Sequence, residues 1–133
     1  VVPLPSGSSS LSTVLFEDKF MESTVQFLVI FMKDSLFAWI GTAEHSIQNL
    51  ALSLLMHGPP NSLPASSELL GGHESEKSEI AVRIAAHIVK RREGGACFVS
   101  YNLLNDPAVA VWAEKVLVGK IVENDKKQAQ ATN

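Results

Sequence analysis

The residues of this chain that could carry chemistry begin with four histidines, which are His45, His57, His73 and His87. Protein metal sites need histidines or cysteines at short fixed spacings, and no two of these histidines, nor any of them with Cys97, have such a spacing. We therefore predict no metal site. The histidines are expected to be ordinary surface or boundary residues, with His87 at the edge of a predicted helix; the alternative is a pH sensor.

The usual signatures of catalysis do not appear either. Cys97 begins an apolar stretch without a neighbouring base, so we interpret it as a buried structural cysteine. Gly119-Lys120 matches the end of a phosphate-binding loop, but Glu114 and Ile121 stand where that pattern requires glycine and a hydroxyl residue. We predict a protein that is not an enzyme and uses no cofactor. The alternative is a small hydrolase or ligand-binding domain with a pocket under the Pro-rich segment.

One basic run, Lys90-Arg91-Arg92, stands out in the second half of the chain. The plain interpretation is a solvated helix end, because basic residues suit the negative end of a helix dipole. The functional interpretation is a patch that docks an acidic partner. The candidate docking residues are therefore Lys90, Arg91 and Arg92.

The composition is that of a small chain with an apolar excess. Its 133 residues include 46% hydrophobic and only 19% charged residues, with a formal net charge of -3, against about 25% charged residues in an average soluble domain. This balance excludes disorder over the whole length, and the acidic character argues against a nucleic-acid binder. We predict one domain at residues 11–123, between a flexible tail at 1–10 and a polar tail at 124–133.

The chain also shows few signs of export. No apolar run approaches the roughly 20 residues that a spanning helix needs, and the N-terminus has no basic segment followed by an apolar one. Cys97 is the one cysteine, so it cannot form an internal disulfide, and there is no Asn-x-Ser/Thr sequon. We therefore expect a reducing intracellular compartment.

Several segments have the composition of strands. They are Leu11–Phe20, Thr24–Met32, Ser35–Ile40 and Ala96–Leu103. Lys33-Asp34 separates the second from the third and indicates a hairpin. Ser46–Met56 is apolar and could be a strand or a short helix; we favour a strand. His57–Gly72 is rich in proline and glycine and is expected to be a connection.

The predicted register of this hairpin pairs Phe31 with Leu36, Val29 with Ala38 and Phe27 with Ile40. Residues directly opposite each other share a face, so the hairpin is apolar on both faces. One face carries Phe27, Val29, Phe31, Leu36, Ala38 and Ile40. The other carries Leu28, Ile30, Met32, Phe37 and Trp39. An antiparallel sheet with one solvated face should alternate apolar and polar residues instead, so both faces must be covered.

Two helices are predicted late in the chain. Glu74–Glu93 has acidic residues early and basic residues late, with Ser75 or Ser78 as the cap and Gly94-Gly95 as the stop. Asp106-Pro107 is predicted to cap a second helix that runs to about Val122. Its expected buried stripe is Val109, Trp112, Ala113, Val116 and Lys120.

These elements predict an α+β fold with a mostly antiparallel sheet of about five or six strands and both helices on one face. No further segment remains to cover the other face, so we infer that a second chain covers it. Interface cores are rich in aromatic residues and methionine. The candidate dimer-interface residues are Leu28, Ile30, Met32, Phe37 and Trp39.

Four segments, in order, carry a resemblance to a known family. Asp34–Gly41 resembles the Asp-Ser-Leu-Phe-x-Trp-Val/Ile-Gly hairpin of the proteasome assembly chaperone 4 family. The other segments are Asn49–Ala51, Ser67–Gly71 and Phe98–Leu103, which resemble its Asn-Leu-Ala, Ser-x-Leu-Leu-Gly and Phe-Val-Ser-Tyr-Asn-Leu elements. The likeness covers about residues 12–120. The His57–Ser66 connection and the tails depart from the family pattern.

The resemblance implies a fold similar to that of proteasome assembly chaperone 3, and a heterodimer of the two sister chaperones formed through their sheets, with a homodimer possible in isolation. It implies a chaperone without catalytic activity or cofactor, which binds α-type subunits of the 20S proteasome and guides assembly of the α-ring. The implied compartments are the cytoplasm and the nucleus. Lys90, Arg91 and Arg92 would be candidates for contacting the proteasome subunit.

Overall fold

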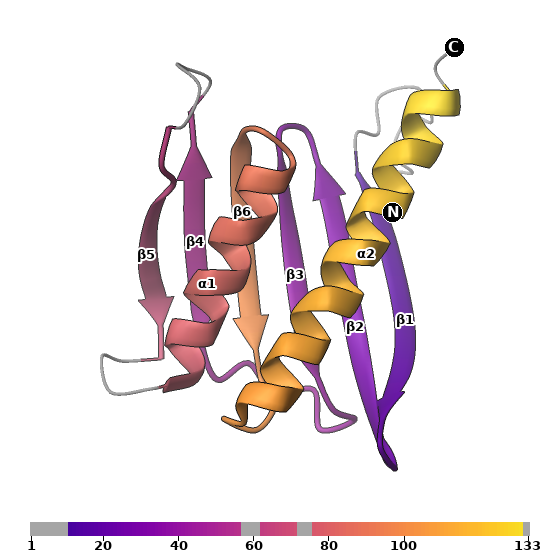
Figure 1. Ribbon diagram of the computed structural model, residues 1–133, viewed down its shortest axis with the longest axis vertical. Helices are drawn as coiled ribbons and strands as arrows, with labels where there is room; N and C mark the ends of the chain where they lie inside the picture. Colours follow the sequence, from indigo (N-terminus) through magenta and orange to yellow (C-terminus); the bar gives the residue numbers. More distant parts are fainter. Residues whose placement is uncertain (1–10, 57–61, 72–75, 132–133) are drawn as a thin grey trace, which may run out of the picture.

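A six-stranded sheet with both helices packed on one of its faces forms this domain (Figure 1). The computed structural model describes residues 11–56, 62–71 and 76–131. The elements are β1 (Ser12–Phe20), β2 (Ser23–Met32), β3 (Ser35–Gly41), β4 (Leu50–Leu55), β5 (Ala65–Leu70), α1 (Glu76–Arg91), β6 (Gly95–Tyr101) and α2 (Pro107–Ala131). The strand order is β1-β2-β3-β6-β4-β5, and within it only β3 and β6 are parallel. The predicted α+β class, the mostly antiparallel sheet and the placement of both helices are confirmed.

The β2–β3 hairpin has the predicted register. Phe31 lies opposite Leu36, Val29 opposite Ala38, and Phe27 opposite Ile40. The turn has two residues, and Asp34 alone adopts a positive φ, of 58°. The carbonyl oxygen of Asp34 accepts a hydrogen bond from the Ala96 amide at 3.0 Å. This turn therefore also anchors the start of β6.

The prediction that His57–Gly72 is a connection was wrong, because β5 lies within it and pairs with β4. Most side chains of β5 are exposed, so this strand has no buried face. Its sequence therefore lacks the alternation of apolar and polar residues by which a strand is predicted. Its backbone pairing with β4 and a contact between the Ser53 and Ser66 hydroxyls at 3.0 Å hold it at the sheet edge. Ser46–Met56 does contain a strand, β4, as favoured.

Helix α1 ends in a local structure that differs from the predicted glycine stop. The residue in the left-handed conformation is Glu93, with φ 64°. The Gly94 amide bonds the Val89 carbonyl at 3.0 Å, and the Glu93 amide bonds the Lys90 carbonyl at 3.2 Å, which together form a Schellman motif. Ser78 is buried inside α1, so it cannot be the N-cap, and Ser75 lies outside the described residues.

Helix α2 begins as predicted, because the Asp106 carboxylate accepts the Ala108 amide hydrogen bond at 2.8 Å. The helix continues to Ala131, so the predicted end at Val122 was wrong, and residues 124–131 of the predicted polar tail are helical. A Glu123–Lys127 ion pair at 3.1 Å spans one turn of this extension. The predicted stripe is also rotated: the fully buried residues are Ala110, Ala113, Leu117 and Ile121.

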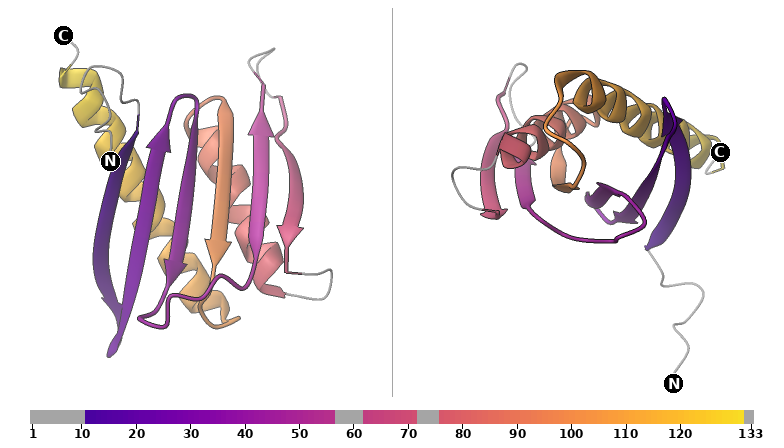
Figure 2. Two further views of the ribbon diagram at one scale, coloured as in Figure 1. Left: turned by 180° about the vertical axis from the view of Figure 1, so that it is seen from behind. Right: turned by 90° about the horizontal axis from the view of Figure 1, so that it is seen from below.

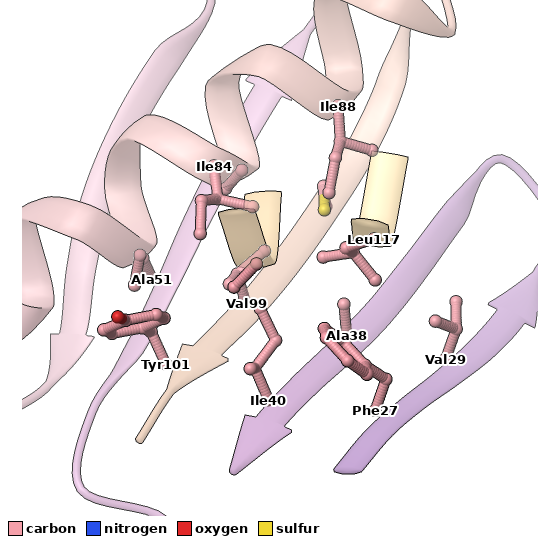
Figure 3. Close-up of a cluster of buried hydrophobic side chains, with 14 of the residues drawn as sticks. Phe27, Val29, Ala38, Ile40, Ala51, Ile84, Ile88, Val99, Tyr101 and Leu117 are labelled. Carbon is pink, nitrogen blue, oxygen red and sulfur yellow. The ribbon is translucent and has the colours of Figure 1, made fainter. Parts of the chain in front are cut away.

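The core fills the space between the helices and the sheet (Figure 3). Ile84 and Ile88 of α1 and Leu117 of α2 lie over sheet residues such as Val99 and Ala38. In Figure 1, α1 lies over β4 and β6 while α2 runs obliquely across the other half of the sheet. Neither helix in the described part of the chain combines the length and apolarity needed to cross a membrane.

Candidate functional site

The face of the sheet away from the helices carries a continuous apolar surface, which we call the open face. Strand alternation puts Phe27, Val29 and Leu36 on the helix side, where they are completely buried. The opposite side carries all five candidate interface residues, which are Leu28, Ile30, Met32, Phe37 and Trp39. Figure 2 shows this side of the sheet without a helix over it.

Cross-strand pairing joins these residues into one patch. Leu28 lies opposite Trp39, and Ile30 lies opposite Phe37. Across the parallel β3–β6 pair, Phe37 lies beside Phe98. Residues directly opposite each other on one face of a sheet bring their side chains into contact. The patch therefore crosses three neighbouring strands at the centre of the sheet.

The patch contains a hollow of about 600 Å³ toward β1 and β2. Its apolar lining is Leu15, Leu28, Phe37, Trp39 and Ile47. Leu15 is 70% exposed and Ile47 is 55% exposed. Polar side chains form its edge, where Gln26 bonds Glu17 at 3.4 Å and His45 at 2.9 Å. An apolar centre inside a polar rim is typical of a protein interface.

Trp39 forms the floor of this hollow and is largely fixed by its own chain. It is only 7% exposed, and its indole nitrogen donates a hydrogen bond to the Ser46 carbonyl at 2.9 Å. The ring covers Gly41 so closely that a Cβ atom there would lie 2.5 Å from a ring carbon. Gly41 therefore leaves room for the tryptophan. Of the five candidates, Trp39 is the one that the isolated chain already buries.

Several open-face residues were missed by the sequence reasoning, among them Leu15, Ile47, Leu52, Leu54 and Phe98. Phe98 sits in a predicted strand, and its alternation with Cys97 and Val99 would have assigned it to the face opposite theirs. Only the pairing of β6 with β3 reveals that it lies beside Phe37. Ile47 lies in the β3–β4 loop, where no periodic signal exists.

A buried amide network holds the β3–β4 loop in place. The Asn49 side chain bonds both the amide (2.9 Å) and the carbonyl (2.5 Å) of Tyr101, as an opposing strand would. The Asn102 side chain accepts the Gln48 amide at 2.6 Å and donates to the Ile40 carbonyl at 3.1 Å. The loop so fixed carries Ile47 and the carbonyl that binds Trp39.

The three residues of the basic run have different surroundings in the structure. The Arg92 guanidinium forms two contacts with the Asp125 carboxylate, at 3.1 and 3.3 Å, and lies 5.7 Å from the centre of the Phe31 ring. Arg92 therefore ties α1 to α2 and to the sheet. Lys90 and Arg91 are exposed. Whether any of the three contacts a partner stays a prediction.

Burial of Cys97 agrees with its predicted structural role. Its side chain is completely buried, and desolvation raises the pKa of the thiol from 9.0 to about 12. The thiol is therefore protonated near neutral pH and is a poor nucleophile. Burial likewise raises the pKa of Tyr101 to about 12, and its hydroxyl donates to the Leu104 carbonyl at 2.9 Å.

Two of the histidines can be placed, while His57 and His73 lie outside the described residues. His45 contacts Gln26, and the His87 ring contacts the Glu114 carboxylate at 2.6 Å. Neither contact forms the serine–histidine–carboxylate arrangement that the hydrolase alternative requires. Within residues 11–56, 62–71 and 76–131, no cluster of histidines, cysteines and acids could hold a metal ion.

Comparison with known proteins gives a consistent result. A sequence model of the family described as proteasome assembly chaperone 4 matches residues 24–103. Proteasome assembly chaperone 4 from Homo sapiens is 35% identical over 91 residues, which are 68% of each chain. Its counterpart from Mus musculus is 33% identical over 101 residues, 75% of this chain and 76% of that one.

The fold has a relative among solved structures. One chain from the crystal structure of a novel chaperone complex for yeast 20S proteasome assembly matches with a TM-score of 0.62. The match covers 90% of this chain and 98% of that chain at 16% sequence identity. It therefore shows a shared fold that extends well beyond the residues of the family match.

Proposed function

The chain belongs to the proteasome assembly chaperone 4 family, and from this premise we propose that it promotes assembly of the 20S proteasome α-ring without being a catalyst. In this proposal it acts as a dimer with a sister assembly chaperone and holds α-type subunits until they are incorporated. It works in the cytoplasm and the nucleus.

The observation that carries the proposal is the apolar open face. Soluble monomers rarely expose a large contiguous apolar patch, and such patches usually mark interaction sites. Here Leu28, Ile30, Met32 and Phe37 stay partly exposed on the open face, although the apolar residues on the opposite side of the same strands are buried. A second sheet packed face to face would cover them, as in a two-layer sandwich.

Polar side chains border the hollow at the edge of the open face. Glu17, Gln26 and His45 border the hollow and bond mainly to one another. A partner with complementary polar groups can keep these residues hydrogen-bonded when water leaves the interface. We propose the heterodimer as the working form because the family resemblance implies it, with a homodimer possible for the isolated chain.

The test compares two charge-introducing variants on tagged full-length protein co-expressed with the sister chaperone. Ile30→Lys places a cation in the centre of the open face, and Leu104→Lys places one at a residue that is already 71% exposed in the β6–α2 loop. We expect Ile30→Lys to lose the sister chaperone while the control retains it. Circular dichroism spectra and melting curves of both variants show whether each remains folded.

Size-exclusion chromatography with light scattering then measures the oligomeric state. The wild-type chain with its sister should elute as a dimer and should capture α-type subunits from native extract. A wild-type chain that stays monomeric with the sister chaperone present, or an Ile30→Lys dimer as stable as the wild type, would contradict the assignment of the open face.

A further inference from the structure

A second hollow lies on the other side of the molecule, between the outer surfaces of α1 and α2. It has a volume of about 690 Å³. Its lining includes Arg83, His87 and Arg91 from α1 and Lys115, Val118 and Gly119 from α2. Both helices lie on the face of the sheet opposite the open face (Figure 2). A partner packed on the open face would therefore leave this helical hollow accessible.

The helical hollow is basic although the whole chain is acidic. Glu114 is the one acid among the described residues that line it, and its carboxylate already contacts Arg83 at 3.3 Å and His87 at 2.6 Å. Arg91 and Lys115 are exposed and add two further positive charges. The basic groups therefore exceed the acid that faces them, in a chain with a net charge of -3. An anionic group entering the hollow would meet complementary charge.

Gly119 lines the helical hollow at a position where the fold does not need glycine. It lies in the interior of α2, and a Cβ atom added to it would meet no heavy atom within 4 Å. Its φ is not positive, so neither packing nor backbone conformation in this chain requires glycine. Alanine would be more favourable in a helix interior. A glycine at this position does, however, let another backbone approach the helix closely.

We propose that the helical hollow docks an acidic polypeptide segment of the client proteasome subunit, which deepens the function proposed above and rests on it. Carboxylates of the segment pair with Arg83, Arg91 and Lys115. An apolar side chain of the segment packs on Val118, and its backbone approaches Gly119. Because the cationic groups are exposed, their pairs with carboxylates are weak and salt-dependent, which suits a client that must be released.

The test measures binding of a fluorescent ten-residue peptide of alternating glutamate and leucine to the purified chaperone dimer by anisotropy. The same peptide with lysine in place of glutamate is the probe control. Arg91→Glu combined with Lys115→Glu should weaken binding by about tenfold or more, because two attractive contacts become repulsive. Lys126→Glu is the matched control, since this exposed residue of α2 does not line the hollow, and it should change binding little.

Gly119→Ala separates docking from folding. It should raise the melting temperature of the chaperone by a few degrees and yet weaken peptide binding, a combination that a purely structural role would not produce. Equal binding by all variants, an equal effect of Lys126→Glu, or tighter binding of polyphosphate than of the peptide would overturn the proposal. Each protein is assayed as the intact dimer, so a wild-type dimer that retains the sister chaperone but does not bind the peptide refutes only this inference.

Discussion

Replacing Asn49 by alanine should destabilise the domain more than the loss of one side chain normally would. Asn49 is fully buried, and its amide group bonds both the N–H and the C=O of Tyr101. Alanine cannot replace either bond, and both backbone groups of Tyr101 would stay buried. The side chain therefore acts as one further peptide unit of the β4–β6 ladder.

The magnitude follows from counting those two groups. Each buried backbone group left without a partner costs about 1–3 kcal/mol, so Asn49→Ala should lower the free energy of unfolding by about 2–6 kcal/mol. A domain of this kind has about 5–15 kcal/mol in total. Asn49→Asp should be at least as harmful, because it keeps the acceptor but sets a carboxylate against the Tyr101 carbonyl.

Urea unfolding followed by circular dichroism measures the change, with Asn105→Ala in the exposed β6–α2 loop as the control. Hydrogen exchange adds a local readout, since the Tyr101 amide should exchange much faster in the alanine variant. If Asn49→Ala unfolds within about 0.5 kcal/mol of the wild type, the two bonds do not stabilise the fold and the reasoning is refuted.

Three further predictions concern other parts of the fold. Gly41→Ala should displace the Trp39 ring and destabilise the chain by about 1–3 kcal/mol. The displacement should alter the fluorescence of Trp39, measured in a variant whose other tryptophan is replaced. Unchanged fluorescence and stability would contradict this prediction. The pKa of Cys97 rises from 9.0 to about 12 on folding, so the unfolded chain loses this proton first as the pH is raised. The free energy of unfolding should therefore fall as pH rises above 9, and should fall less in Cys97→Ala. An equal decrease of this free energy in both proteins would disprove the prediction. Asp125→Ala removes the partner of Arg92 and should speed amide exchange in the last turns of α2 without affecting its first turn, at a cost of about 1 kcal/mol or less.

The open face and the helical hollow lie on opposite sides of the sheet, and the architecture of the domain explains their different character. Both helices pack on one side of the sheet, so the hydrophobic effect can close the core on that side only. The apolar residues on the other side stay available for a partner. The helices in turn expose their charged residues, which suit weak and reversible contacts rather than permanent ones.

Local sequence patterns determined most of the secondary structure and one half of the candidate site. The alternation through Phe27–Ile40 predicted the hairpin register and both of its faces, because side-chain direction in a strand depends only on position. Asp106-Pro107 predicted the start of α2 because capping is a local hydrogen bond. All four family segments lie in paired strands or in the loop that Asn49 and Asn102 hold.

Other features were decided by contacts between distant residues. Strand β5 exists because the edge of β4 offers unpaired backbone groups, which its own polar sequence does not reveal. The last turns of α2 lie beside the end of α1, where Asp125 contacts Arg92. This contact gives Arg92 a structural role that the sequence did not predict, while its docking role stays a prediction. Phe98 joins the open face only because β6 inserts beside β3. Likewise, Arg83, Arg91 and Lys115 line one hollow only because α1 and α2 pack side by side. Local periodicity determines which way a side chain points, whereas its neighbours depend on how the chain closes in three dimensions.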